Sequence, residues 1–200
     1  MPDQNPRYNI APTDPVLTVG PDRADVVRWG IDGASGGLFN LRSETAITRP
    51  HYQRLLLGRR VIVPASHFYE WRTVGGRRLP VAVSRADGRP LNLAGLLGAW
   101  QHQSAVTILT TTPNAELEPL HERMPVVLTD DDAATWVLEE ISIDQAAAFL
   151  KPCPAGWLSL AAASPLVNSV GNDGPQLLDP DTLPAEHQLE LIPPGQAYDV

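Results

Sequence analysis

The chain has 200 residues, 43% of them hydrophobic and 19% charged, which suits one globular domain with or without a tail and excludes a disordered or fibrous protein. No apolar run reaches the roughly 20 residues that a membrane span needs, and the first residues lack the pattern of a signal peptide, so we expect a soluble cytoplasmic protein. Cys153 is the only cysteine, which excludes an intramolecular disulfide and any CxxC motif.

The net charge of −8 argues against a nucleic-acid-binding protein until its distribution is considered. Residues 1–112 hold 13 arginines against 8 acidic residues, a net charge of +5. Residues 113–200 hold two basic residues against 15 acidic ones, a net charge of −13. This asymmetry permits a basic face on an acidic protein, although ordinary solvated charge is the simpler explanation for any single arginine.

The first half of the chain predicts short strands joined by turns. Strands are expected at residues 25–31, 61–64, 67–71, 79–85, 91–100 and 105–112. The Gly/Ser-rich residues 33–37 predict a flexible loop, and residues 46–57 predict a short helix that ends at Gly58. Gly75 and Gly76 are a hairpin signal, and hairpins at this spacing favour an antiparallel sheet or barrel.

Helical patterns appear in the second half. A short helix is expected within residues 115–123, another after the N-cap Thr129, and a third from Ser142 to Leu150. Further strands are expected at residues 125–128, 157–163 and 165–170. The predicted fold class is α+β, with a mainly antiparallel, curled sheet and flanking helices. Residues 181–200 are rich in proline and acidic residues and predict a tail behind a single domain at residues 1–180.

Few polar residues stand out as candidates for chemistry. Glu70 lies among aromatic residues in HFYEWR, where partial desolvation would suit acid–base work, and His121 could exchange protons near neutral pH. Residue type alone favours a structural role for both. Arg42 could clamp a phosphate or pair with Glu44. Cys153 lies between two prolines and is interpreted as an inert, small hydrophobic residue.

Seven segments in order give the chain a specific resemblance. They are RYNIAPT (7–13), RWG (28–30), FNLRSETA (39–46), RRVIVPASHFYEW (59–71), LAGLLGAW (93–100), TILTTTPNAELEPLHERMPVVL (107–128) and VGNDGPQLLDP (170–180). Together they resemble the SRAP family of abasic-site-processing proteins over about residues 7–180. The resemblance implies an α+β fold around a curled, barrel-like sheet, in a bacterial or phage protein of the DNA damage response that needs no metal or other cofactor.

The resemblance also implies a partner and a chemistry. Members recognise abasic sites in single-stranded DNA, remove their initiator methionine, and use an N-terminal cysteine to form a stable DNA–protein crosslink with the ring-opened sugar. By position, Glu70, His121 and Asn40 would be the catalytic residues around the sugar. Contacts to DNA would come from Arg42, Thr110, Arg123, Asn9 and Pro12, with clamps for phosphates and a small apolar wedge at Pro12. A monomer bound to DNA near the nucleoid is expected, with protein partners unknown.

Three features depart from the family pattern. The printed chain carries Pro2 where the family has cysteine, the segment between Gly30 and Asn40 is short, and Leu41 replaces a small residue. Cys153 cannot substitute, because the nucleophile must also offer a free α-amine. The chain as printed is therefore expected to form no crosslink. Two alternatives stay open: a start assigned too late, or a relative that binds single-stranded DNA without covalent chemistry. A third is reuse of the pocket for another small-molecule reaction, or of the fold as an interaction module only.

Overall fold

The computed structural model describes residues 5–34, 36–138 and 140–179, so the predicted tail at 181–200 lies outside the described residues. The strands are β1 (Pro15–Val19), β2 (Ala24–Trp29), β3 (Ile31–Gly33), β4 (Gly36–Leu38), β5 (Asn40–Arg42), β6 (Arg60–Ala65), β7 (His67–Val74), β8 (Arg77–Arg85), β9 (Leu91–Trp100), β10 (Gln103–Thr111), β11 (Met124–Pro125), β12 (Val127–Leu128) and β13 (Leu158–Ala162). The α-helices are α1 (Ser43–Thr48), α2 (Pro50–Gly58), α3 (Asp130–Leu138) and α4 (Ile143–Phe149), followed by the 3-10 helices η1 (Pro165–Asn168) and η2 (Pro175–Leu178).

The main sheet curls round on itself. Its order is β11-β10-β2-β1-β6-β9-β12. Strand β9 also pairs antiparallel with β10, so β10, β2, β1, β6 and β9 form a closed ring. Strand β1 pairs with β6 at a single residue pair, Val19 with Ile62. Because the pairing is so short at this point, the sheet is curled rather than a regular barrel. Strands β2 and β5 both run parallel to β10, and the other pairings are antiparallel. The predicted α+β class with a mainly antiparallel, curled sheet is confirmed.

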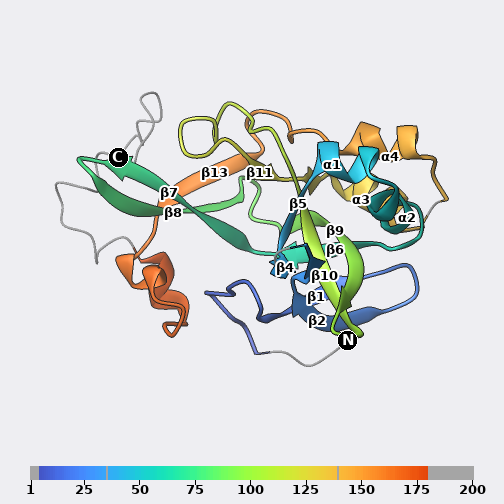
Figure 1. Cartoon of the computed structure of the whole chain (residues 1–200). Coiled ribbons are helices and arrows are strands. Elements are labelled where there is room, and N and C mark those ends of the chain that lie inside the picture. The colour runs from blue at the N-terminus through green and yellow to red at the C-terminus, as the bar shows by residue number, and fades with distance from the viewer. Residues whose placement is uncertain (1–4, 35, 139, 180–200) are drawn as a thin grey trace.

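A second sheet extends away from the first. It has three antiparallel strands in the order β13-β8-β7, and the β7–β8 ribbon projects to the left of the main sheet in Figure 1. The ribbon turns at Gly75 and Gly76, whose φ angles of 54° and 79° are the left-handed pair that a tight hairpin needs and that glycine adopts without strain. Strand β7 is an edge strand of this sheet, with β8 on one side.

Two hydrophobic cores lie on the two faces of the curled sheet. One fills the space between the main sheet and the β7–β8–β13 sheet and includes Val61, Val106 and Val83. The other lies under the helices and includes Leu41, Leu109 and Trp136. Figure 1 shows the four helices gathered on one side of the main sheet. No helix within the described residues is long and apolar enough to cross a membrane.

Local signals defined several elements as predicted. Thr129 accepts a hydrogen bond from the backbone of Asp132 and caps α3, and Ser142 forms a capping box with Gln145 at the start of α4. Each cap satisfies backbone N–H groups that the first helical turn leaves without partners. Strand β9 has the predicted bounds, and the other predicted strands of the first half differ from the observed ones by a few residues at their ends.

The helix predicted at residues 46–57 is wrong in its extent. The structure has two helices here, α1 from Ser43 and α2 from Pro50, separated by Arg49 in an extended conformation. Pro50 is the cause, because proline disfavours helical geometry in the residue before it but fits the first position of a new helix.

Three further predictions are wrong for reasons of context. The loop predicted at residues 33–37 contributes instead to a small hairpin, in which Gly33 of β3 faces Gly36 of β4. The helix predicted within 115–123 is a series of turns, since Pro119 removes a backbone donor. The strand predicted at 165–170 is the 3-10 helix η1, which begins with Pro165 after the cap Ser164.

Candidate functional site

Glu70 lies on the inner face of β7, toward the space between the two sheets. Phe68 is on the same face and packs against the core between the sheets, and Glu70 lies opposite the buried Val81 of β8. Burial raises the pKa of the Glu70 carboxyl above its usual range, while the nearby His121 and Arg78 act in the opposite direction. Glu70 therefore combines the partial desolvation that the sequence suggested with two basic neighbours that it did not.

His121 is held by the backbone two residues further along. Its Nδ1 atom lies 3.0 Å from the backbone nitrogen of Arg123 and 2.9 Å from the carbonyl oxygen of the same residue. A neutral ring can accept a hydrogen bond from that N–H, and a protonated ring can donate one to that carbonyl. Both charge states of His121 thus have a backbone partner at Nδ1, which leaves Nε2 as the nitrogen for proton exchange.

Asn40, Arg42 and Thr110 come together through the pairing of β5 with β10. The register places Asn40 beside Ile108 and Arg42 beside Thr110. Leu41 and Leu109 point into the core under the helices, so by alternation the three polar residues face the opposite side, which Glu70 also faces. Arg42 is exposed, and its ion pair with Glu122 is long at 3.8 Å. Such an exposed pair contributes little, so the Arg42 guanidinium is available to a ligand.

Arg123 is engaged within the protein. Its two terminal nitrogens lie 2.8 and 2.9 Å from the carboxylate oxygens of Glu44, and Nη2 also donates to the Thr110 carbonyl at 2.6 Å. The Arg123 side chain is only 15% exposed, and its Nε is buried without a hydrogen-bond partner in the described part of the chain. The Arg123 hydrogen bond lowers the pKa of Glu44 below its usual range. Arg123 therefore ties α1 to β10 and fixes the loop that carries His121.

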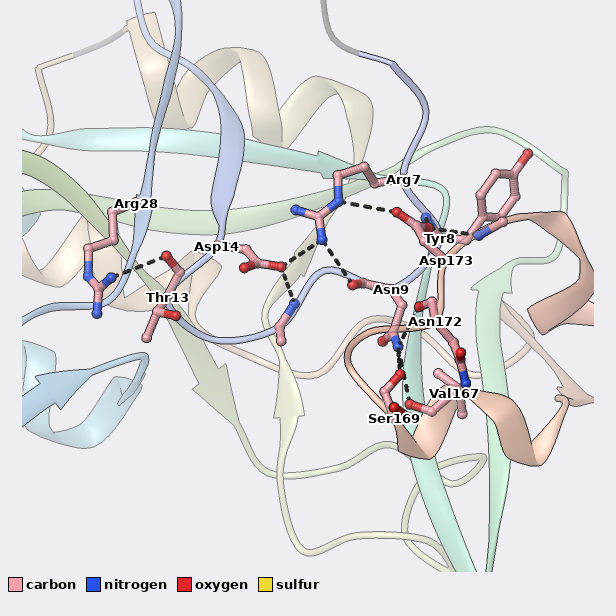
Figure 2. Close-up of polar contacts among 12 residues, drawn as sticks. Arg7, Tyr8, Asn9, Thr13, Asp14, Arg28, Val167, Ser169, Asn172 and Asp173 are labelled. Atoms are coloured by element: carbon pink, nitrogen blue, oxygen red, sulfur yellow. Dashed lines mark hydrogen bonds and ion pairs between the residues drawn. The ribbon is translucent and has the colours of Figure 1, made fainter.

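Asn9 and Pro12 lie in the segment that precedes β1. Asn9 is buried, and its side-chain Nδ2 lies 3.1–3.2 Å from the carbonyl oxygens of Val167, Ser169 and Asn172, as Figure 2 shows. Pro12 is exposed in a turn whose next residue, Thr13, has a left-handed φ of 87°. That turn is joined to the sheet by the Thr13 N–H, which donates to the Trp29 carbonyl at 3.0 Å.

The structure thus brings together six of the eight predicted site residues and places two apart. Glu70, His121, Asn40, Arg42, Thr110 and Arg123 are linked through β7, β5, β10 and the loop before β11. Asn9 and Pro12 belong to the neighbouring segment on the N-terminal side. Glu44 was one predicted partner of Arg42, but it pairs with Arg123 instead.

Cys153 lies in the core between the sheets. It is 4% exposed, and burial raises the pKa of its thiol to about 11, so the thiol stays protonated and unreactive at neutral pH. This agrees with its interpretation as a small hydrophobic residue. Across the described ranges, no group of three His, Cys, Asp or Glu side chains converges as a metal site would require. A pocket of about 320 Å³ beside the β1–β2 hairpin includes none of the predicted site residues.

Comparisons with known proteins identify the family of the chain. The family model described as SOS response associated peptidase (SRAP) matches residues 1–170. The chain belongs to the SRAP family. It is 31% identical to the abasic site processing protein YoqW of Bacillus subtilis, over 88% of this chain and 87% of that protein. It is also 31% identical to the abasic site processing protein YedK of Escherichia coli, over 87% and 84% of the two chains.

Solved structures show the same fold as this SRAP protein. A protein from Bacteroides thetaiotaomicron superposes with a TM-score of 0.74 at 20% identity, covering 84% of this chain and 81% of that one. A phage-related protein from Bordetella bronchiseptica superposes with a TM-score of 0.65 at 27% identity, covering 80% and 83%. The curled sheet with helices on one side is therefore shared with proteins whose sequences have diverged widely.

Proposed function

We propose that this protein recognises abasic sites in single-stranded DNA and that Glu70 and His121 form its proton-transfer pair. The observation that carries the proposal is the proximity of His121 to Glu70, whose carboxyl is partly desolvated by burial. SRAP relatives named abasic site processing proteins support the choice of ligand. Asn40 is expected to orient the sugar, and the expected DNA contacts are Arg42 and Thr110, with Pro12 on the N-terminal side.

The proposed chemistry follows from the sugar. Opening the ring of an abasic sugar needs a base to take the proton from the C1′ hydroxyl and an acid to protonate O4′ as the C1′–O4′ bond breaks. A carboxyl with a raised pKa and an imidazole, whose ring nitrogen can accept or donate a proton, suit these two tasks. Arg42 would hold a backbone phosphate with two forked hydrogen bonds. Arg123 would support His121 rather than contact DNA, because its guanidinium is already paired with Glu44.

Binding is tested with labelled single-stranded oligonucleotides by fluorescence anisotropy. We expect tighter binding to an oligonucleotide with one abasic site than to the undamaged strand or to duplex DNA. Arg42→Ala should weaken binding, whereas the control Arg23→Ala should not, because Arg23 lies on the β1–β2 hairpin and is paired with Asp25. Equal affinity for damaged and undamaged strands would refute the proposal.

Crosslinking is tested separately by denaturing electrophoresis after incubation with the abasic oligonucleotide. The printed chain has Pro2 where the family's crosslinking cysteine is expected, so we expect no heat-stable shifted band. A version in which a Cys-led segment precedes RYNIAPT should give one. A heat-stable band from the printed chain would show that the cysteine is dispensable, and the loss of non-covalent binding in both versions would contradict the proposed function itself.

A further inference from the structure

The outer face of β7 is held by two segments from opposite ends of the described chain. Tyr69 and Trp71 alternate with Glu70 and point away from it. The Tyr69 hydroxyl donates to the carbonyl of Tyr8 at 2.9 Å, and the Trp71 indole N–H donates to the side chain of Asn168 at 2.7 Å. The strand that carries the candidate acid is therefore contacted on one face by the core and on the other by residues 8 and 168.

These two segments are also bound to each other, and together they are called the clasp, defined as residues 7–9 and 167–173. Asp173 accepts the backbone N–H of Tyr8 at 2.6 Å and the Nε of Arg7 at 3.3 Å. Asn9 donates to three carbonyls of the C-terminal turn, as described above, and Figure 2 shows both sets of contacts side by side. Because Asn9 is buried, these hydrogen bonds are shielded from competing water.

Hydrogen bonds continue from the clasp to the start of β7. The Tyr69 hydroxyl is 3.0 Å from Nε2 of His67, and Nδ1 of His67 is 2.9 Å from the hydroxyl of Ser66. One assignment satisfies every group: Ser66 donates to Nδ1, Nε2–H donates to Tyr69, and Tyr69 donates to Tyr8. Burial lowers the pKa of His67 and raises that of Tyr69 to about 12, so both stay uncharged in the form this chain of donors requires.

We propose that Asn9, Asp173 and Tyr69 are positioning residues, which hold β7 from its outer face so that Glu70 stays in place beside His121. An edge strand has a neighbouring strand on one side only, so side-chain contacts contribute more to its order than they would in the middle of a sheet. The functional meaning of this placement rests on the proposed role of Glu70. The placement itself does not, and it can be measured without DNA.

The test uses the whole chain with Asn9→Ala, Asp173→Asn and Tyr69→Phe, and with Asp87→Asn as the matched control. Asp87 is an acidic surface residue paired with Arg85 and Arg89, away from the clasp. Tyr69→Phe removes one hydroxyl and keeps the ring, so it serves if Asn9→Ala does not fold. We expect hydrogen exchange at the amides of residues 68–72 to become about tenfold faster in these three variants and to stay unchanged in β9 and in the control.

The second readout is the titration of the Glu70 carboxyl followed by NMR, assigned with Glu70→Gln. A loosened β7 admits water to Glu70, so the midpoint of its titration should fall toward that of an ordinary glutamate. A lower melting temperature with unchanged exchange in β7 and an unchanged Glu70 midpoint would show that the clasp serves general stability only and would overturn the proposal. If both readouts shift as expected but abasic DNA is not bound, the positioning role of the clasp is supported and the proposed function is refuted.

Discussion

At the scale of single residues, the site depends on side chains whose neighbours come from distant parts of the sequence. Glu70 owes its raised pKa to burial against the core between the sheets, and His121 is held through its Nδ1 by the backbone of Arg123. Arg123 is in turn fixed by Glu44. The two members of the candidate acid–base pair are thus held separately. Strand β7 positions Glu70, and the Glu44–Arg123 ion pair fixes the loop that carries His121.

Glu70→Gln tests the acid–base role. Loss of a general acid–base group costs about 10²–10⁴-fold in rate, so opening of the abasic sugar, followed by an aldehyde-trapping reagent, should slow by at least about 10²-fold. The pH–rate profile of the unchanged protein should have a limb above the ordinary titration range of glutamate, because burial raises the pKa of Glu70. That limb should disappear in the variant. Glu118→Gln, at an exposed residue in the turns before His121, is the control and should keep the full rate.

Glu44→Gln tests the support behind His121. The pair is partly exposed, so its contribution to the free energy of unfolding is about 0.5 kcal/mol after screening by solvent. Arg123 lowers the pKa of Glu44 in the folded state, so this contribution is present above the pKa of the unfolded state and is lost as the pH falls through the folded pKa. Urea unfolding should show the difference between the two proteins at pH 7 and its disappearance in the acid range, below the ordinary pKa of glutamate. A difference that persists unchanged in acid would contradict an ionic origin.

At the scale of elements, the helices matter because they hold the outer face of the curled sheet. Helix α3 inserts Trp136, which is fully buried and donates from its indole nitrogen to the carbonyl of Val61 in β6 at 3.1 Å. Arg60 donates to the carbonyls of Leu56 and Trp136, so a charged residue of β6 caps α2 and binds α3. The sheet, and β5 and β10 with it, is therefore braced by contacts outside the site.

Trp136→Ala tests this bracing. Removal of a buried aromatic side chain leaves a cavity and costs about 3–5 kcal/mol. We expect a loss of that size in the free energy of unfolding, measured with urea or guanidinium. Leu138→Ala, in the same helix but 66% exposed, should change stability by less than about 0.5 kcal/mol. Equal effects of the two substitutions would show that α3 does not brace the sheet as described.

At the scale of the whole molecule, the charge is divided along the chain. The first 112 residues are net positive and the rest strongly negative, and the exposed Arg42 of the candidate site belongs to the positive part. A protein with a net negative charge can still bind DNA through a local group of basic side chains, because screening limits charge effects to about 10 Å at 0.1 M salt.

Salt dependence tests this picture. Each phosphate contact to a single strand adds about −0.7 to the slope of log K against log salt concentration, so binding of abasic DNA should weaken steeply as salt rises. Arg42→Ala should reduce the slope by about that amount for one lost contact. Arg23→Ala should leave it unchanged. A binding constant that does not vary with salt would exclude phosphate contacts as a source of affinity.

The sequence by itself determined the elements whose signals are local. Apolar runs between turn signals defined strands such as β8 and β9, Gly75 and Gly76 defined the hairpin, and side-chain caps at Thr129 and Ser142 defined α3 and α4. These features depend on hydrogen bonds and backbone angles within a few residues, so a local pattern suffices to predict them. The ordered motifs also indicated the SRAP family and proposed Glu70 and His121 as its acid–base pair.

Only the tertiary structure decided how those residues are held. Asn9 and the carbonyl of Val167 are 158 positions apart, and Glu44 and Arg123 are 79 apart, so no local pattern could pair them. The division of residues 43–58 into two helices and η1 in place of a strand are different, because they follow from the nearby Pro50 and Pro165. The long-range pairings form because the fold brings distant segments to one place, and their geometry follows from packing rather than from the order of residues.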